Sequence, residues 1–464
     1  MLARLMRGIG ANAFGQVVVA GLQLSLVPVF ASHWGLDRYG VWILLSTIPS
    51  YLALGDFGFA TAAGNDMTMK VARGDKAGAI TTFQSAFAAV VVGSSGIGLL
   101  ALTICALLPP NVLTISAPIA PQEIRATLGL LSIYGVICLL GSIVMAGFKC
   151  AGLYATGTLS QALLQLTEGT VAILTVCLGG SLWNVACAYL LCRLVGIGMQ
   201  AFWLSRSVPW LDIGFKRAQF TEVKRLSQPA VAVMALPLAQ ATFLQGTAIV
   251  LGAATSAPTV AIFTTVRTLI RTGVQLTTLV NHAIMPEFSA AVARNDTQLQ
   301  ARILRFTLWL SVAILVPSAV VLLIWGRDIV AIWTRGLIHP AEIFIGIMTA
   351  VMLLNATWHP VSNLILAANR HASYSYLYLF AAILSVIICY PLARWFGTVG
   401  AGLSLTLLDA FMFFHIMRLA TVFMVRSVDQ ARSDQMVHST IYDQLTIIGK
   451  RLFHRNRRMN LRKP

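Results

Sequence analysis

Charged side chains are scarce in this sequence. Asp, Glu, Lys and Arg make up 11% of its 464 residues, whereas they make up about a quarter of an average soluble domain. The mean hydropathy is +0.79. This composition excludes a soluble enzyme, a disordered protein and a secreted module held together by disulfides. The apolar residues recur in blocks of about 20, which is the length of a helix that crosses a bilayer. The sequence therefore predicts an all-α polytopic membrane protein.

Motifs for enzymatic chemistry are also missing. The sequence has no P-loop, no His-Glu-x-x-His and no comparable spacing of metal ligands. No connection between apolar blocks exceeds about 20 residues, which is well below the size of a soluble catalytic domain. The seven cysteines lie in or beside apolar blocks and form no redox or metal motif. We therefore expect a protein that is not an enzyme and that uses no cofactor and no metal.

The apolar blocks, read against the charged and turn residues between them, predict twelve membrane-spanning helices. The first block follows a short basic stretch, but it is too long for a signal peptide and a second block follows almost at once. We expect it to be retained as a helix. The predicted spans cover residues 9–32, 41–65, 80–108, 127–149, 157–180, 184–205, 226–252, 258–286, 303–325, 343–367, 373–392 and 399–424.

The formal net charge of +17 reports membrane topology rather than a nucleic-acid partner. Of the 33 Lys and Arg residues, 25 lie at the amino terminus, in even-numbered connections or in the carboxy-terminal tail, and 5 lie in odd-numbered connections. Positive charge gathers on the cytoplasmic side of membrane proteins, so we expect both termini in the cytoplasm. The basic end of the chain either rests on anionic lipid or is simply solvated.

A short motif occurs twice, 221 residues apart. Met69–Asp75 follows the second predicted span and resembles Ala290–Asp296, which follows the eighth. The first six spans shifted by this offset fall on the last six, which predicts two parallel six-helix repeats with a central cleft and alternating access. We expect an amino-terminal bundle over residues 1–205, a cytoplasmic connection over 206–225, a second bundle over 226–424 and a basic cytoplasmic tail over 425–464.

The eighth predicted span carries a polar stripe with two arginines. Residues at steps of three and four share one face of a helix, and the stripe comprises Thr264, Arg267, Thr268, Arg271, Gln275, Thr278 and His282. A charge inside a bilayer needs a partner or a water-filled cavity. Either Arg267 and Arg271 form the cationic wall of a cleft, or carboxylates neutralise them for packing. We favour the cleft, because ionisable residues inside membranes mark functional sites.

The carboxylates inside predicted spans are Asp56, Glu168 and Asp409. Glu168 shares a stripe with Gln161 and Gln165 on the fifth span. A similar stripe on the first span comprises Asn12, Gln16 and Gln23. We expect both stripes to line the amino-terminal side of the cleft.

Two further carboxylates leave alternatives open. Asp56 lies between Gly55 and Gly58, where it either accompanies an opened helix or acts as a structural cap. Asp409 is a candidate partner for Arg193 of the sixth span. The candidate substrate-contacting residues of the cleft are Arg267, Arg271, Gln275, Arg193, Glu168, Gln165, Asp56 and Asp409.

The first 80 residues resemble a known family. Gly8–Asn12, Gly15-Gln16, Pro28–Phe30, Trp34–Trp42, Tyr51–Phe59 and Asn65 are similar to the amino-terminal signature of oligosaccharide and polysaccharide flippases. These belong to the multidrug/oligosaccharidyl-lipid/polysaccharide (MOP) exporter superfamily. The resemblance implies a MATE-like fold and a flippase of the bacterial inner membrane. Its substrate would be a polyprenyl-diphosphate-linked saccharide for O-antigen, capsule or exopolysaccharide assembly. We also expect a functional monomer in the lipid bilayer, with polymerase or export machinery of the same pathway as a possible partner.

Two other functions compete with the flippase. A drug or cation antiporter of the same superfamily would require an acidic pocket, which two arginines oppose. A membrane-bound transferase or polymerase would act on the same lipid-linked saccharide, but it would change the covalent structure of its substrate. A flippase changes only the side of the membrane on which the substrate lies.

Overall fold

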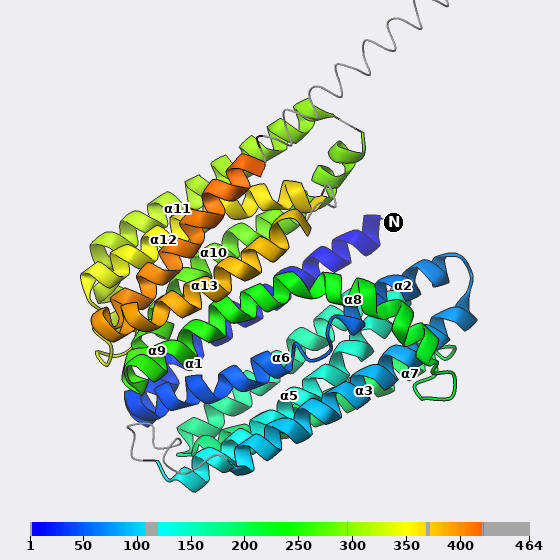
Figure 1. The fold of residues 1–464 in the computed structure, drawn as a ribbon, viewed down its shortest axis with the longest axis horizontal. Coiled ribbons are helices and arrows are strands. Elements are labelled where there is room, and N and C mark those ends of the chain that lie inside the picture. The colour runs from blue at the N-terminus through cyan, green and yellow to red at the C-terminus, as the bar shows by residue number, and fades with distance from the viewer. Residues whose placement is uncertain (1, 108–118, 295, 368–371, 420, 422–464) are drawn as a thin grey trace, which may run out of the picture.

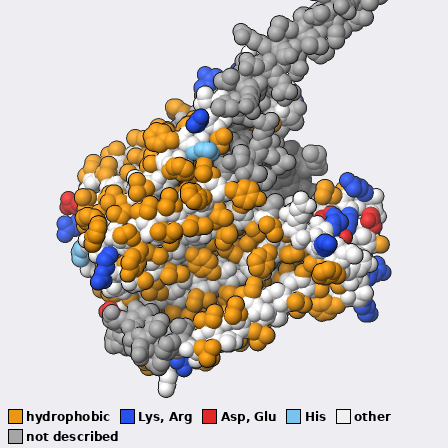
Figure 2. Space-filling view, in the orientation of Figure 1, with side chains coloured by type: hydrophobic (Ala, Val, Ile, Leu, Met, Phe, Trp, Pro, Cys, Tyr) orange, Lys and Arg blue, Asp and Glu red, His pale blue; other side chains and the backbone are white. Residues whose placement is uncertain are grey.

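The computed structural model describes residues 2–107, 119–294, 296–367, 372–419 and 421, and within them the chain is all helical. The predicted basic tail over residues 425–464 lies outside the described residues. Ten of the described helices are long and apolar enough to cross a membrane. Figure 2 shows hydrophobic side chains over most of the visible face, with Lys, Arg, Asp and Glu gathered toward its ends. The chain is a multi-pass α-helical membrane protein.

The amino-terminal half contains six helices. They are α1 (Leu2–Leu52), α2 (Phe59–Ala72), α3 (Lys76–Leu107), α5 (Pro121–Cys150), α6 (Tyr154–Cys177) and α7 (Leu182–Ser207). Helix α1 bends at Gly35, whose φ of 72° is not helical, so it comprises two segments that meet at an angle. The second predicted span, 41–65, was too long. It ends at Leu52 because Phe57 and Gly58 have positive φ values in the turn before α2.

The carboxy-terminal half repeats this order. It contains α8 (Phe220–Ala241), the π-helical turn η1 (Thr242–Gly246), α9 (Thr247–Ala254), α10 (Ala257–Ala293), α11 (Thr297–Trp333), α12 (Glu342–Ala367), α13 (Ala372–Phe396) and a last helix (Thr398–Leu419). Helix α8 begins at Phe220, so the last six residues of the predicted 206–225 connection are helical.

The number of apolar helices is two below the twelve predicted spans, for two separate reasons. Helix α1 covers the first predicted span and most of the second. Helix α10, which corresponds to the eighth span, is 37 residues long but carries the arginine stripe and is therefore less apolar than the others.

The internal repeat is confirmed by the helix boundaries. Helices α3 and α11 begin at Lys76 and Thr297, and α5 and α12 begin at Pro121 and Glu342; both pairs are 221 residues apart. The two copies of the motif also have the same local structure. Asp75 accepts a hydrogen bond from the Gly78 N–H (2.7 Å), and Asp296 accepts one from the Leu299 N–H (2.9 Å). Each aspartate thus caps the amino end of a repeat-related helix.

The two halves form two lobes (Figure 1). The N-lobe comprises α1 to α7, and the C-lobe comprises α8 to the last helix. They meet at one end, where Val27, Phe30 and Val41 of α1 share an apolar cluster with Ala257 and Ala261 of α10. The Trp333 indole N–H donates to the Leu24 carbonyl across the same junction (2.8 Å). A Cβ on Gly40 would lie 2.0 Å from the Ala257 carbonyl oxygen, so only glycine permits this approach.

Helix α8 connects the lobes at both of its ends. Near its start, Leu226 belongs to the apolar core of the N-lobe, whereas Ala239 near its end packs with Trp358 and Tyr378 of the C-lobe. In Figure 1, α8 runs between the two lobes.

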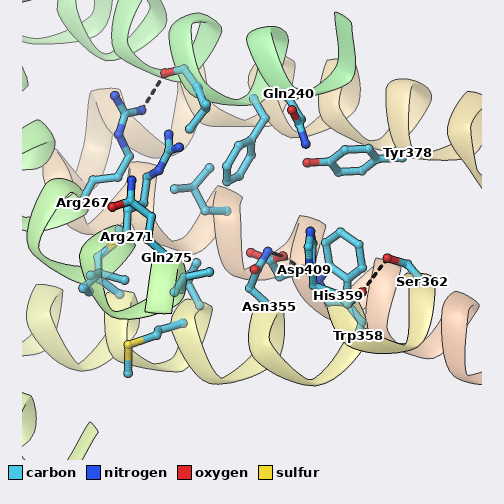
Figure 3. A pocket seen from close by; sticks show the side chains of 18 of the residues that line it. Gln240, Arg267, Arg271, Gln275, Asn355, Trp358, His359, Ser362, Tyr378 and Asp409 are labelled. Atoms are coloured by element: carbon cyan, nitrogen blue, oxygen red, sulfur yellow. Dashed lines mark hydrogen bonds between the residues drawn. The ribbon is translucent and has the colours of Figure 1, made fainter. Parts of the chain in front are cut away.

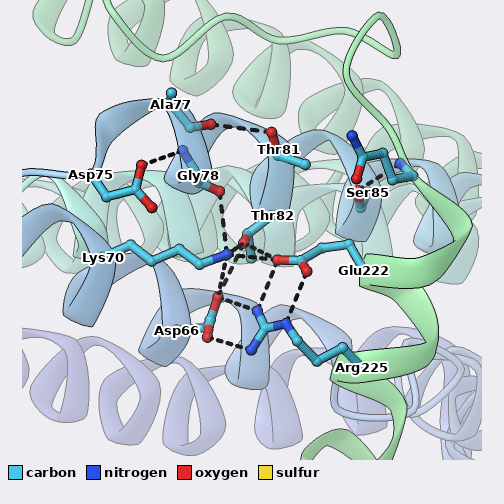
Figure 4. A network of polar contacts seen from close by, with 11 residues as sticks. Asp66, Lys70, Asp75, Ala77, Gly78, Thr81, Thr82, Ser85, Glu222 and Arg225 are labelled. Carbon is cyan, nitrogen blue, oxygen red and sulfur yellow. Dashed lines mark hydrogen bonds and ion pairs between the residues drawn. The ribbon is translucent and has the colours of Figure 1, made fainter.

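A polar network fixes the first turn of α8 to α2 and α3 (Figure 4). Glu222 accepts hydrogen bonds from Lys70 (2.7 Å) and from the Thr82 hydroxyl (2.6 Å). Arg225 donates to both oxygens of Asp66, at 2.9 and 2.6 Å. The network lies outside the apolar spans, because α2 is not among them and the span within α8 begins at Met234.

Candidate functional site

A cavity of about 530 Å³ lies within the C-lobe. Its lining residues come from α8, η1, α10, α12, α13 and the last helix, and α1 of the N-lobe contributes Gln16. Figure 3 shows the polar lining residues in two groups: one contains the arginines of α10, and the other surrounds Asp409. The volume is in the range of pockets that hold small molecules, about 300–1,000 Å³.

The cationic group consists of Arg267, Arg271 and Gln275, on one face of α10 (Figure 3). The Arg267 guanidinium donates to the Leu244 carbonyl (2.6 Å) and lies over the Phe263 ring, with 5.3 Å from its central carbon to the ring centroid. Leu244 belongs to η1, where the π-helical turn disturbs the regular hydrogen bonds of the backbone. Arg267 is therefore anchored to the protein.

Arg271, one turn further along α10, is different. Its side chain is exposed, and no hydrogen bond or ion pair joins it to any described residue. The described ion pairs include neither arginine, so Asp56, Glu168 and Asp409 do not neutralise them. The interpretation that carboxylates compensate this pair for packing is contradicted. An uncompensated guanidinium offers its donors to an anion in the cavity.

Gln275 extends the cationic group toward the other lobe. Its side-chain amide donates to the Gln23 side chain of α1 (3.2 Å), while its own Oε1 is buried without a partner among the described residues. Thus Gln16 and Gln23, from the predicted stripe on the first span, both lie at this junction. Asn12, from the same stripe, instead accepts a hydrogen bond from the Tyr154 hydroxyl (3.2 Å).

The second polar group surrounds Asp409, on the last helix (Figure 3). Asp409 Oδ1 accepts hydrogen bonds from the Trp358 indole N–H (2.8 Å) and from the Asn355 amide (3.1 Å). His359 and Tyr378 also line this end. Asp409 is thus held by two neutral donors of α12.

Arg193 does not pair with Asp409, and that expectation was wrong. Arg193 forms a buried ion pair with Glu168 (2.5 Å), and it donates to the Tyr134 hydroxyl (2.8 Å). This group lies inside the N-lobe between α5, α6 and α7, away from the residues that line the cavity. The two halves use their intramembrane arginines differently, because Arg193 has a carboxylate within reach and Arg271 has none.

Two other predicted residues also lie outside the cavity lining. Gln165 is half-buried on α6. Asp56 accepts a hydrogen bond from the Gly58 N–H (3.0 Å) in the turn between α1 and α2, which is the structural cap of the two alternatives. The side chains of Thr278 and His282 lie outside the described part of the chain.

Several lining residues were missed in the sequence. Asn355, Trp358, His359 and Ser362 line the cavity from α12 at steps of three, four and seven residues. This spacing places them on one helix face, so the pattern was readable beforehand. Gln240 and Tyr378 were missed as well, but each is a single polar residue in an apolar run and gave no periodic signal.

The described residues contain no group of three or more His, Cys, Asp or Glu side chains placed to hold a metal ion. The cavity therefore offers hydrogen-bond donors, one carboxylate and aromatic surfaces. This set can bind and orient a polar ligand.

Solved structures of known transporters resemble this arrangement. An inward-facing multidrug resistance MATE family transporter of the MOP superfamily has a TM-score of 0.66 with this chain at 14% identity, over 88% of this chain and 99% of that one. The chain has the MATE fold. An outward-facing structure of a MATE family transporter has a TM-score of 0.60 at 13% identity, over 92% and 96% of the two chains.

A third MATE-fold structure is a MOP superfamily transporter from Pyrococcus furiosus Vc1 (DSM3638), for which reverse polarity of the binding pocket suggests a different function. Its TM-score is 0.59 at 12% identity, over 92% of this chain and 94% of that one.

Sequence comparison gives a weaker similarity. No protein-family model matches the chain. The uncharacterized membrane protein EpsK of Bacillus subtilis (strain 168) is 22% identical over 223 residues, which are 45% of this chain and 43% of EpsK. The match therefore spans less than half the length of this relative.

Proposed function

We propose that this chain is a flippase of the bacterial inner membrane. It moves a polyprenyl-diphosphate-linked oligosaccharide to the periplasmic leaflet for surface polysaccharide biosynthesis. The observation that carries this proposal is the uncompensated guanidinium of Arg271, beside the anchored Arg267, in a cavity between membrane helices. A guanidinium binds phosphate oxygens through paired hydrogen bonds, and burial strengthens them. A diphosphate supplies the negative charge that the two arginines lack within the protein.

The size of the cavity fits this substrate in part. About 530 Å³ holds a head group of small-molecule size rather than a whole oligosaccharide with its lipid. The diphosphate and the sugar next to it occupy the cavity, and the polyprenyl chain stays in the bilayer.

The junction between the lobes supports alternating access. The apolar cluster of α1 and α10 closes the end that carries the connection after α11, which we place in the periplasm because the basic residues gather at the other end. Both termini are then cytoplasmic, and the cavity faces inward. The higher TM-score with the inward-facing MATE structure agrees with this orientation. Opening the junction while the other end closes would release the head group to the periplasm.

A drug or cation antiporter is the second candidate. Two observations favour it: the buried carboxylate of Asp409 lines the cavity, and the chain shares its fold with a multidrug resistance transporter. The two functions predict substrates of opposite charge.

The test uses the purified protein in proteoliposomes, with two fluorescent substrates. One is a short-chain polyprenyl diphosphosaccharide and the other is the organic cation ethidium. We expect transport of the anion only, with its chemical structure unchanged by mass spectrometry. Arg271→Ala should slow transport roughly 10- to 100-fold, because two charge-assisted hydrogen bonds are lost.

Two variants control this experiment. Arg271→Lys should restore transport only in part, since an ammonium lacks the planar pair of donors. Arg305→Ala removes a positive charge from an exposed position of α11 outside the cavity and should leave transport unchanged. Transport of ethidium alone would support the antiporter, and a covalently altered lipid-linked product would support a transferase.

A further inference from the structure

The Asp409 end of the cavity contains an acceptor that the protein leaves unused. Asp409 is 1% exposed, and both donors that reach it, Trp358 and Asn355, bind Oδ1. Oδ2 is buried and has no hydrogen-bond partner among the described residues. The two neutral donors fix the plane of the carboxylate, and Asp409 itself lines the cavity.

A buried acceptor without a donor is unfavourable, and more so when it belongs to a carboxylate inside a membrane. No described Lys, Arg or His lies within ion-pair distance of Asp409. The missing donor must therefore come from what enters the cavity. Hydroxyl groups and amide N–H groups are suitable donors, and a saccharide carries several of them in fixed positions.

We propose that this end of the cavity is a sugar subsite, in which Asp409 Oδ2 accepts a hydrogen bond from a hydroxyl or acetamido N–H group. The sugar is the hexopyranose joined to the diphosphate, and it is neutral. The inference rests on the proposed function, because the arginine end must hold the diphosphate. Figure 3 shows the two groups at separate ends of one cavity, as a diphosphate and its attached sugar require.

The side chains around Asp409 match this ligand. Tyr378 and Trp358 combine an apolar ring with a polar atom, and apolar ring faces pack against the C–H faces of pyranoses. The Trp358 N–H is directed to Asp409. One ring therefore both positions the carboxylate and supplies apolar surface. Asp409 thus determines which sugar is accepted, whereas the arginines determine that the ligand is anionic.

The test measures binding to the full-length purified protein by isothermal titration. The probes are farnesyl diphosphate and four glycosylated forms, in which the diphosphate carries glucose, galactose, N-acetylglucosamine or N-acetylgalactosamine. We expect the wild-type protein to bind at least one glycosylated probe roughly 10- to 100-fold more tightly than farnesyl diphosphate, as a hydrogen bond to a charged group implies.

Asp409→Asn should abolish this advantage and leave the affinity for farnesyl diphosphate unchanged. Arg271→Ala should weaken the binding of all five probes. The matched control is Thr406→Val, one turn earlier on the same helix, where the hydroxyl bonds only to the Gly402 carbonyl and does not line the cavity. It should bind all probes as the wild type does.

Several outcomes would overturn the sugar subsite and leave the proposed function intact. One is the absence of any sugar advantage in the wild type, and another is an advantage that survives in Asp409→Asn. Equal weakening of all probes in that variant would assign Asp409 a structural role. If the variant lost only a dependence of farnesyl diphosphate binding on pH or Na⁺, Asp409 would be a site for a proton or cation. Failure of the wild type to bind farnesyl diphosphate would overturn the proposed function as well.

Discussion

At the scale of single residues, the two arginines of α10 have the same sequence environment and different structural roles. Arg267 donates to the Leu244 carbonyl of η1, whereas Arg271 has no partner among the described residues. The first is part of the protein's own hydrogen bonding, and the second is available to a ligand. A pair of adjacent arginines on one helix face thus divides into a positioning residue and a binding residue.

This division predicts different results for the two alanine variants. Arg267→Ala leaves the Leu244 carbonyl without its donor inside the C-lobe, which costs about 1–3 kcal/mol. We expect a lower melting temperature in detergent and a reduced abundance in membranes. Arg271→Ala removes no hydrogen bond of the protein, so its melting temperature should equal that of the wild type. Equal destabilisation by both substitutions would contradict the division.

At the scale of elements, the first turn of α8 is held by charge. The pKa of Glu222 is lowered from its usual value, first by the hydrogen bonds from Arg225 and then by Lys70 and Thr82. Burial raises the pKa of Asp66, but the hydrogen bonds from Arg225 and Lys70 outweigh it, and the net shift is downward. Both carboxylates therefore stabilise the folded state in their ionised form.

The network predicts a pH dependence of stability. A carboxylate with a lowered pKa in the folded state contributes stability above its unfolded pKa, about 4, and loses it as the pH falls through the folded value. The melting temperature should therefore decrease on acidification below about pH 4 to 5.

The neutral variant Glu222→Gln should lose part of this decrease and be less stable at pH 7, by about 1 kcal/mol. Glu342→Gln is the matched control, because Glu342 is exposed and its contact with Arg327 is 3.5 Å long. A decrease of the same size in Glu222→Gln and in the wild type would show that other groups cause it.

At the scale of the whole molecule, the lobes meet through one apolar junction, and glycine makes the close approach possible. A side chain on Gly40 would collide with the Ala257 backbone, whereas Gly21 on the same helix has no atom within 4 Å of its Cβ position. Gly40→Val should therefore separate the lobes at this end, and Gly21→Val should not.

Cysteine labelling in intact spheroplasts measures this opening. In a cysteine-free background, an impermeant maleimide added outside should label Leu337→Cys, in the connection after α11, and not Phe215→Cys, in the connection before α8. Gln16→Cys lines the cavity and should be labelled only when Gly40→Val is also present. Labelling of Gln16→Cys from outside without that substitution would contradict a closed periplasmic end.

The sequence by itself determined the membrane architecture of this protein. Helix length, apolar blocks and the 221-residue repeat depend on residues near one another in the chain, and the repeat returned as matching helix starts and matching aspartate caps. The polar stripe of α10 was likewise visible, because helix periodicity assigns each residue to a face. Prediction was poorer where backbone geometry intervened, as in the turn that ends α1 at Leu52.

Only the tertiary structure decided which faces meet. Arg193 and Glu168 lie on neighbouring helices of one lobe and neutralise each other, while Asp409 is bound by neutral donors of α12 and Arg271 by no described residue. The cavity consequently lies mainly within the C-lobe, and Gln165 and Glu168 do not line it. Helix periodicity orients a side chain around its own axis, but the rotation and neighbour of each helix are set by packing across the whole bundle. For that reason the charged residues could be found in the sequence, and their partners could not.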